Sequence, residues 1–176
     1  MLVLVVGPSG AGKDTVLTLA KHALRDDPRV RFVRRVITRP AEAGAEDHEA
    51  VSDDEFERRA FALQWRAHGL RYGIPADVVA DLERGIVVVA NASRGVIAEA
   101  ASCFLVRVIE VTAPPAILAQ RLAARGREAA ADMASRLART VPLPADVPTY
   151  TVVNDATPAQ AADRFIKNLG AYSVDC

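Results

Sequence analysis

The stretch Met1-Leu-Val-Leu-Val-Val-Gly-Pro-Ser-Gly-Ala-Gly-Lys-Asp-Thr15 opens the chain and decides its fold. Leu2 to Val6 is a short apolar run rich in β-branched residues, as expected of a strand that is buried on both faces. Gly7 to Lys13 has the spacing of a phosphate-binding loop, with a glycine, four residues, a second glycine and a lysine. A helix is expected from Thr15 to Leu24, where apolar side chains recur at helical spacing. Strand, loop and helix therefore follow in the order that such a loop requires.

The glycine loop predicts an anion site formed by the main chain. Glycines allow successive N–H groups to turn towards a phosphate, and the helix that follows directs the positive end of its dipole to the same place. Lys13 adds a mobile positive charge for the terminal phosphates of a nucleotide. The residues expected to bind this nucleotide are Gly7, Pro8, Ser9, Gly10, Ala11, Gly12, Lys13, Asp14 and Thr15.

Asp14 departs from the usual pattern, in which serine or threonine follows the glycine–lysine pair and ligates Mg²⁺. A carboxylate also ligates Mg²⁺, directly or through water, but it places a negative charge close to the phosphates. The loop predicts a nucleotide site with Mg²⁺, and Asp14 is a candidate metal ligand whose role stays open. The alternative to a nucleotide site is a glycine-rich helix start that binds no ligand.

Length and composition favour one domain with a small inserted subdomain. The chain has 176 residues, of which 51% are hydrophobic, so it can bury a substantial core. Its 22 basic and 22 acidic residues balance, which gives no support for a nucleic-acid or membrane-surface partner. The two cysteines form no metal spacing and no disulfide framework. No signal peptide fits before the first strand and no apolar run approaches the length of a membrane span, so we expect a cytoplasmic protein. The sequence does not predict an oligomeric state.

The rest of the chain predicts strands that alternate with helices, and therefore an α/β fold with a parallel core sheet. Ser52 begins a capping box that predicts a helix to about Ala60, and a hairpin is expected around His68-Gly69. Residues 41–50 are expected to form a loop. Further strands are expected at 30–37, 86–90, 104–111 and 150–153, and further helices at 75–84, 114–125, 128–140 and 157–169. Only the stretch from about 34 to 74 breaks the alternation, which indicates the insertion.

These motifs together resemble the guanylate kinase family of P-loop kinases over nearly the whole chain. Besides the glycine loop, the resemblance rests on Thr38-Arg39-Pro40, Asp47-His48, the hairpin from Trp65 to Gly73, the arginines at 121, 125 and 136, and Val153-Asn154-Asp155. It implies a three-layer P-loop fold with a core of 1–33, 75–120 and 141–176, an acceptor-binding insert at about 34–74 and a lid at about 121–140. It also implies that Asn154 binds the nucleotide and that the transferring phosphate is contacted by Lys13, Arg121, Arg125 and Arg136.

Several positions depart from the guanylate kinases, and these departures concern the phosphate acceptor. Gln64 and Ala92 stand where that family has acidic residues that recognise guanine. Ile74 replaces a hydroxyl residue, and His48 replaces a tyrosine that binds phosphate. A site that recognises a base by hydrogen bonds loses roughly 10⁴-fold or more in discrimination when those partners are missing. Guanylate is therefore not the expected acceptor.

A narrower branch of the family has these substitutions. The loop with Asp14 and the segments 34–40, 46–52 and 68–73 resemble the ribose 1,5-bisphosphate phosphokinases of phosphonate breakdown, which make 5-phosphoribosyl 1-diphosphate with ATP. The acceptor phosphate of such a reaction is already an anion, so no general base is required and catalysis rests on alignment and charge neutralisation. The residues expected to contact the sugar phosphate are Arg39, His48, Gln64, Arg71, Tyr72, Ser93 and Arg94.

Other interpretations stay open at this point. The chain could be a guanylate or other nucleoside monophosphate kinase, or a guanylate-kinase-like module that binds proteins without catalysis. The second is disfavoured by Gly12, Lys13 and the arginines of the lid. The arginines could also lie on solvated helix faces, His48 could cap a loop, and Tyr72 could belong to the core.

Overall fold

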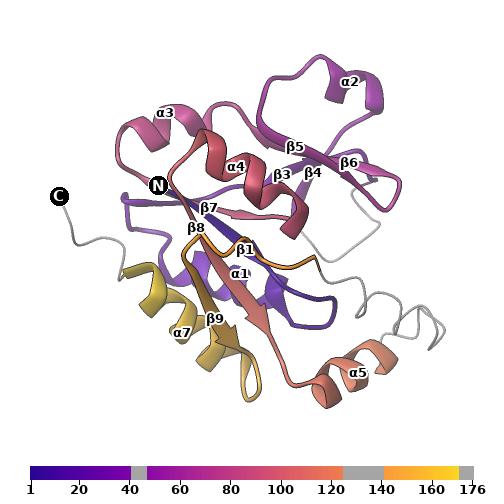
Figure 1. Ribbon diagram of the computed structural model, residues 1–176, viewed down its shortest axis with the longest axis vertical. Helices are drawn as coiled ribbons and strands as arrows, with labels where there is room; N and C mark the ends of the chain where they lie inside the picture. Colours follow the sequence, from indigo (N-terminus) through magenta and orange to yellow (C-terminus); the bar gives the residue numbers. More distant parts are fainter. Residues whose placement is uncertain (41–46, 125–140, 171–176) are drawn as a thin grey trace. The chain divides into compact units, whose positions relative to one another are not determined.

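The computed structural model describes residues 1–40, 47–124 and 141–170 of the chain (Figure 1). The chain divides into two units, one formed by Met1–Leu4 with Asp26–Arg107 and one by Val5–Arg25 with Val108–Cys176. Among the residues described, no helix combines the length and the apolar composition that are needed to cross a membrane.

Five strands form the main sheet, in the order β2-β7-β1-β8-β9. Their bounds are Val30–Phe32 (β2), Val87–Asn91 (β7), Leu2–Val6 (β1), Val106–Thr112 (β8) and Thr149–Val153 (β9). β2 runs parallel to β7, and β8 runs parallel to β9. Every residue of β1 and of β7 is buried, as expected of valine-rich strands that are covered on both faces. The predicted α/β class with a parallel core sheet is confirmed.

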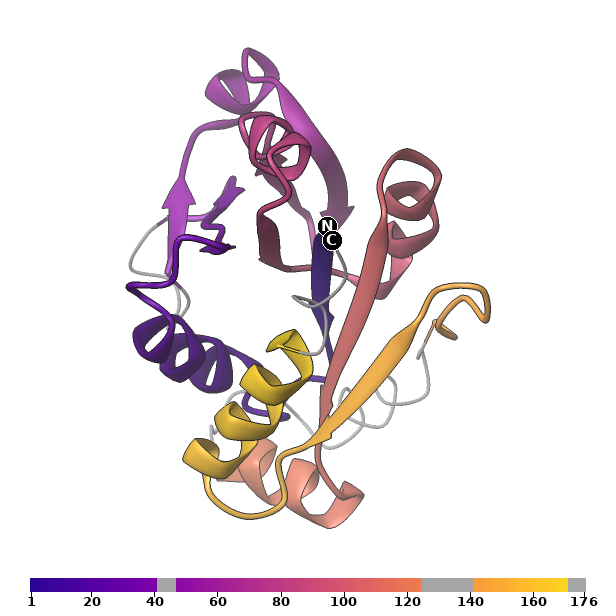
Figure 2. The same cartoon turned by 90° about the vertical axis from the view of Figure 1, so that its left-hand side faces the viewer.

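Within its described residues, the second unit contains the helices α1 (Lys13–Ala23), α5 (Pro115–Ala124) and α7 (Pro158–Gly170). α1 and α7 lie side by side (Figure 2). A capping box fixes the start of α7, because Thr157 Oγ1 accepts a hydrogen bond from the Gln160 N–H while Gln160 Oε1 accepts one from the Thr157 N–H. The helix has one apolar face, and its buried residues are Ala161, Ala162, Phe165 and Leu169.

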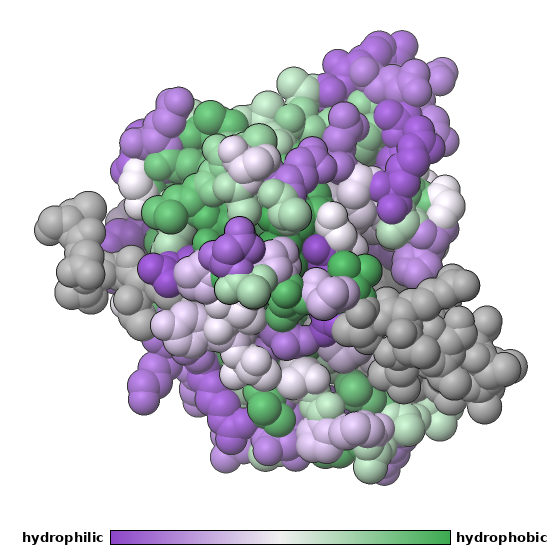
Figure 3. Space-filling model, in the orientation of Figure 1, coloured by the Kyte–Doolittle hydropathy of each residue, from purple (hydrophilic) through white to green (hydrophobic). Residues whose placement is uncertain are grey.

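A four-stranded sheet lies within the first unit, in the order β4-β3-β6-β5. Its strands are His48–Ala50 (β4), Arg35–Ile37 (β3), Leu70–Pro75 (β6) and Phe61–Ala67 (β5). β5 and β6 form the predicted antiparallel hairpin, and α2 (Asp53–Glu57) begins at the predicted capping box of Ser52 and Glu55. Phe56 is the buried residue of α2, and hydrophilic residues cover this corner of the surface (Figure 3). The unit also contains α3 (Val78–Glu83), η1 (Arg94–Val96) and α4 (Ile97–Cys103).

At three places the type or the number of elements differs from the prediction. The single strand expected at 30–37 is two strands, since β2 pairs with β7 in one sheet whereas β3 pairs with β4 and β6 in the other. The loop expected at 41–50 includes a short strand, β4, in its described part. Pro75 ends β6 instead of opening a helix, and α3 begins at Val78. In each case the pairing partner along the sheet, which local sequence does not specify, decides the bounds.

A buried carboxylate ties α3 to β2. Asp81 is buried on α3 and accepts hydrogen bonds from Arg31 of β2 and from Arg84. Arg31 also donates to Asp77, at 2.7 Å. The hydrogen bonds from Arg31 and then from Arg84 hold the pKa of the Asp81 carboxyl below its ordinary value. The ionised form of Asp81 therefore stabilises the folded chain.

We expect Asp81→Asn to lower the melting temperature by several degrees near neutral pH, because Arg31 and Arg84 lose the buried carboxylate with which they pair. Because the pKa of Asp81 is lower in the folded chain, its carboxylate stabilises the fold at any pH above its pKa in the unfolded chain. This stabilisation is lost as the pH falls through the pKa of Asp81 in the folded chain. The difference in melting temperature between wild type and Asp81→Asn should therefore shrink in acid. Asp77→Asn is the control, since the Asp77 side chain is 62% exposed and its pair with Arg31 contributes little. Thermal unfolding followed by circular dichroism checks this, and an Asp81→Asn deficit that stays constant into acid would contradict it.

Candidate active site

Glycines shape the loop between β1 and α1. Gly12 has a φ of 78°, in the left-handed region, and a Cβ at this position would lie 2.5 Å from Asn154 Nδ2. A Cβ at Gly7 would collide with the main-chain oxygen of Val111 in β8. Only glycine allows the main chain to turn this closely against its neighbours. Gly12 is also the N-cap residue of α1 and has no side chain to cap it, and the start of a helix is a favourable place for a phosphate.

Asn154 holds the loop from the end of β9. It is 2% exposed, its N–H donates to the Thr112 carbonyl at 2.7 Å, and its Nδ2 donates to the Ala11 carbonyl at 2.8 Å. Its Oδ1 is buried and accepts no hydrogen bond within the described parts of the chain. Asn154 therefore connects the phosphate loop to the ends of β8 and β9.

Arg121 of α5 lies against the same loop. Its Nη1 is 3.5 Å from the carbonyl oxygens of Gly10 and Ala11, and its Nη2 donates to the carbonyl of Asn154 at 3.2 Å. The structure thus brings Arg121, Asn154 and the loop together, as the sequence predicted them to lie near one nucleotide. The guanidinium places a positive charge beside the loop and also holds its carbonyl groups.

Lys13 and Asp14 are the first two residues of α1. The Lys13 side chain is 18% exposed, and its Nζ lies 3.7 Å from Asp14 Oδ1, whereas the Asp14 side chain is 46% exposed. Asp14 is therefore accessible to a ligand at the loop. In the described part of the chain, no group of three or more histidine, cysteine, aspartate or glutamate side chains is arranged to hold a metal ion. A Mg²⁺ ion at the loop would take oxygen ligands from the nucleotide as well as from Asp14.

In the first unit, Arg39 and His48 contact each other. His48 Nδ1 lies 3.3 Å from Arg39 Nη2, and His48 Nε2 lies 3.2 Å from the Arg39 carbonyl oxygen. His48 is buried at the start of β4, which runs parallel to β3. The structure thus brings together two residues that the sequence predicted to bind the acceptor.

Tyr72 lies in an aromatic stack on the hairpin. Its ring stacks on Trp65, directly opposite on β5, with centroids 5.5 Å apart. The guanidinium of Arg35 lies 5.2 Å from the Tyr72 ring centroid and 5.9 Å from that of Trp65. Arg35 is buried and was not selected from the sequence. The available signal was the alternation of side chains along β3, which places Arg35 and Val36 on opposite faces of the sheet.

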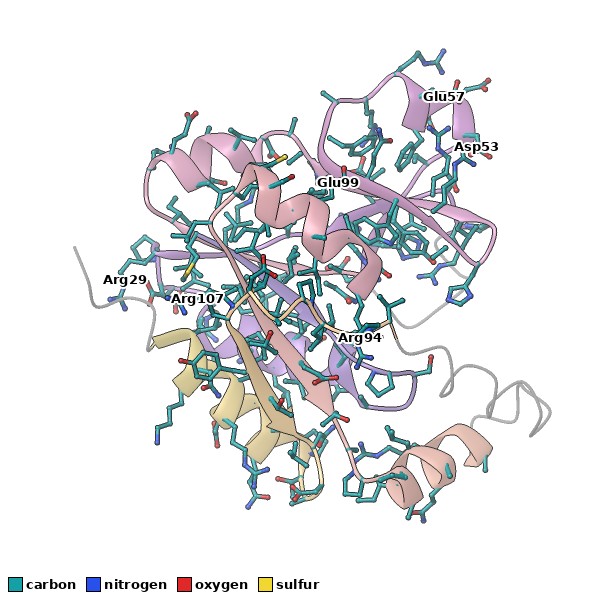
Figure 4. The ribbon with its side chains drawn as sticks, in the orientation of Figure 1. Arg29, Asp53, Glu57, Arg94, Glu99 and Arg107 are labelled. Atoms are coloured by element: carbon teal, nitrogen blue, oxygen red, sulfur yellow. The ribbon has the colours of Figure 1, made fainter. Side chains whose placement is uncertain are left out.

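Arg71 contacts side chains of α2. Its guanidinium lies 4.5 Å from the Phe56 ring centroid, and its Nη1 donates to Glu57 Oε1 at 2.9 Å. Its N–H also donates to Thr38 Oγ1 at 3.0 Å. Asp53 and Glu57 both project from α2 on this side (Figure 4). The positive charge of Arg71 is thus already paired with a carboxylate.

The other predicted residues are spread over the chain. Gln64 is exposed on β5, opposite Gly73. Ser93 accepts a hydrogen bond from the Gly95 N–H at 3.4 Å and caps η1, where Arg94 begins the turn (Figure 4). Arg125 and Arg136 lie outside the described residues.

Comparison with known proteins decides the family. No family model matches the chain. The ribose 1,5-bisphosphate phosphokinase PhnN of Acidiphilium cryptum is 58% identical over 166 residues, which are 94% of this chain and 90% of that protein. The chain belongs to the PhnN family.

A bifunctional relative and a solved structure also match the chain. A bifunctional ribose 1,5-bisphosphokinase-thymidine phosphorylase of Azorhizobium caulinodans is 47% identical over 181 residues, a match that covers 99% of this chain and only 26% of that protein. The crystal structure of guanylate kinase from Anaplasma phagocytophilum matches with a TM-score of 0.68 at 21% identity, covering 99% of this chain and 86% of that one. This likeness shows that the chain has a guanylate-kinase-like fold, and it does not show the phosphate acceptor.

The contact between Gly12 and Asn154 leads to a test of the loop. We expect Gly12→Ala to weaken MgATP binding by at least about tenfold, because the new methyl group displaces the Asn154 amide and strains a left-handed residue. Gly85→Ala is a matched control, since Gly85 has a φ of 79° but nothing lies within 4 Å of a Cβ there. Isothermal titration calorimetry with MgATP measures both variants, and equal affinities for Gly12→Ala and wild type would contradict the role of this contact.

Proposed function

We propose that the chain transfers the γ-phosphoryl group of ATP to the 1-phosphate of ribose 1,5-bisphosphate and so makes 5-phosphoribosyl 1-diphosphate for phosphonate breakdown. The identity of 58% with a PhnN protein along 90% of its length carries the proposal. In the reaction an oxygen of the acceptor phosphate forms a bond to the γ-phosphorus, and the bond from that phosphorus to the β-phosphate oxygen breaks, releasing ADP. ATP and a sugar phosphate are metabolites of the cytoplasm, where we place the reaction.

The donor part of the site is the phosphate loop, Gly7 to Thr15. The N–H groups at the start of α1 and the Lys13 ammonium offset the negative charge of the β- and γ-phosphates. Asn154 and Arg121 hold the carbonyl of Ala11 and so keep the N–H groups of the loop in place. Arg125 and Arg136 supply further positive charge from the proposed lid at 121–140. Mg²⁺, when bound near Asp14, neutralises part of the phosphate charge.

The acceptor part of the site is the proposed insert, residues 34–74, with Ser93 and Arg94. Arg39 binds an acceptor phosphate, because its guanidinium can make paired hydrogen bonds to phosphate oxygens. Arg71, Tyr72 and Gln64 contribute further polar groups from the hairpin. Two residues disfavour a guanine base: Ala92 has no carboxylate, and Ile74 is completely buried. A phosphate acceptor is anionic, so the site needs positioning and charge rather than a base.

The function is tested by a coupled assay of ADP release with several acceptors. We expect turnover with ribose 1,5-bisphosphate, little with GMP, and a loss of about 10²-fold or more in kcat for Lys13→Ala, because the variant lacks a charge at the transferring group. Lys21→Ala, near the end of the same helix, is the control and should keep wild-type activity. Efficient turnover of GMP with none of the sugar phosphate would overturn the proposal in favour of a nucleoside monophosphate kinase. Absence of turnover with every acceptor would favour a binding module.

The role of Asp14 is tested by a Mg²⁺ titration of the same assay. Asp14→Asn removes the charge that attracts the metal, so half-maximal activity should need several-fold more Mg²⁺. Asp163→Asn, an exposed aspartate on α7, is the control for a general change in charge. Superimposable titrations of Asp14→Asn and wild type would show that Asp14 does not help to hold Mg²⁺.

A further inference from the structure

We propose that His48 is a positioning residue: it holds the Arg39 guanidinium ready for the acceptor phosphate, as a neutral imidazole with its proton on Nε2. The proposal rests on the proposed function, in which Arg39 binds that phosphate. It assigns to His48 an action through Arg39 and no contact with the acceptor itself.

The two residues contact each other at both ring nitrogens. His48 Nδ1 is 3.3 Å from Arg39 Nη2, and His48 Nε2 is 3.2 Å from the Arg39 carbonyl oxygen. The side chain and the main chain of Arg39 therefore bracket one imidazole. His48 is 4% exposed, so this arrangement is largely shielded from water.

The chemistry of the partners assigns the proton. A guanidinium only donates hydrogen bonds, and a carbonyl oxygen only accepts them. Nδ1 must therefore accept from Arg39 Nη2, and Nε2 must carry the hydrogen that is donated to the Arg39 carbonyl. A doubly protonated imidazole would turn an N–H towards the guanidinium, and the two positive charges would repel each other. Only the neutral Nε2–H tautomer satisfies both contacts.

Neighbouring arginines surround the main chain at His48. Arg34 Nη2 donates to the His48 carbonyl at 2.9 Å, and Arg34 Nε pairs with Asp47 at 2.7 Å. Arg35 lies directly opposite His48 in the register of β3 and β4. The main chain of β4 is thus fixed at its first residue. To donate to a phosphate itself, His48 Nε2 would have to give up its hydrogen bond to the Arg39 carbonyl.

Substitutions at position 48 separate the two ring nitrogens. The Oδ1 of asparagine can replace Nδ1 as the acceptor for Arg39, whereas His48→Gln and His48→Phe place no acceptor there. We expect His48→Gln and His48→Phe to raise KM for ribose 1,5-bisphosphate by about tenfold, the usual effect of losing a hydrogen bond to a charged group. KM for ATP should not change, and His48→Asn should stay close to wild type. His68→Asn, in the hairpin turn, is the matched control, because His68 has a φ of 52° that asparagine tolerates.

A double-mutant cycle shows whether His48 acts through Arg39. If it does, His48→Phe should raise the acceptor KM in the wild-type background and have no further effect in Arg39→Ala. Additive effects of the two substitutions would mean that His48 contacts the acceptor independently, and would overturn the proposal. A rise in the acceptor KM for His48→Asn as large as for His48→Phe would overturn it as well.

Nitrogen-15 NMR of histidine-labelled protein tests the pairing without any turnover. The resonances of His48 are identified by their absence in His48→Asn and should show the Nε2–H tautomer. A protonated ring or the Nδ1–H tautomer would overturn the proposal. A wild-type chain that does not phosphorylate ribose 1,5-bisphosphate would instead overturn the proposed function, and with it the role in acceptor binding. The NMR measurement still decides whether His48 and Arg39 are paired, so the two failures are distinguishable.

Discussion

The hydrogen bond from Asn154 Nδ2 to the Ala11 carbonyl is the contact on which the phosphate loop depends. It joins residues 143 positions apart in the sequence and holds the loop after β1 against the end of β9. The same contact explains why position 12 must lack a side chain, since a Cβ would meet the Asn154 amide. Arg121 lies beside the carbonyls of Gly10 and Ala11, and Asn154 donates to that of Ala11, so the loop is held from two sides. A preformed cradle of this kind costs little reorganisation when an anion binds.

The proposed acceptor part uses arginines that are held by neighbouring side chains. Arg39 contacts His48, Arg35 lies against two aromatic rings, and Arg71 pairs with Glu57 above the Phe56 ring. Residues that replace guanine-reading carboxylates, such as Gln64, also remove negative charge. The base of a nucleotide lies at the end of the sugar away from the phosphate that is extended. When the 1-phosphate of ribose 1,5-bisphosphate is the acceptor, the 5-phosphate takes that place, and a carboxylate there would repel it. The change of acceptor that we propose therefore follows from charge as much as from lost hydrogen bonds.

The parts of the fold with strong local signals could be predicted from the sequence. β1, the loop and the capping box at Ser52 are each specified by residues within a few positions of one another. The division of 30–37 into β2 and β3 could not be predicted, because it depends on which strand lies alongside, and a strand as short as β4 has no clear periodicity. The site residues of the loop and Asn154 were selected from motifs. The pairing of Arg71 with Glu57 and of His48 with Arg39 depends on tertiary packing that no motif describes, and Arg125 and Arg136 lie outside the described residues.

We propose that the loop binds ATP and that its γ-phosphoryl group is transferred to the anomeric phosphate of a sugar. Phosphorus-31 NMR of the wild-type protein with MgATP and ribose 1,5-bisphosphate tests it most directly, because it identifies the phosphate that is extended. We expect the signal of the 1-phosphate to be replaced by the two coupled signals of a diphosphate, while the 5-phosphate signal persists and ADP accumulates. Unchanged sugar signals beside intact ATP, or a new diphosphate at the 5-position, would contradict it.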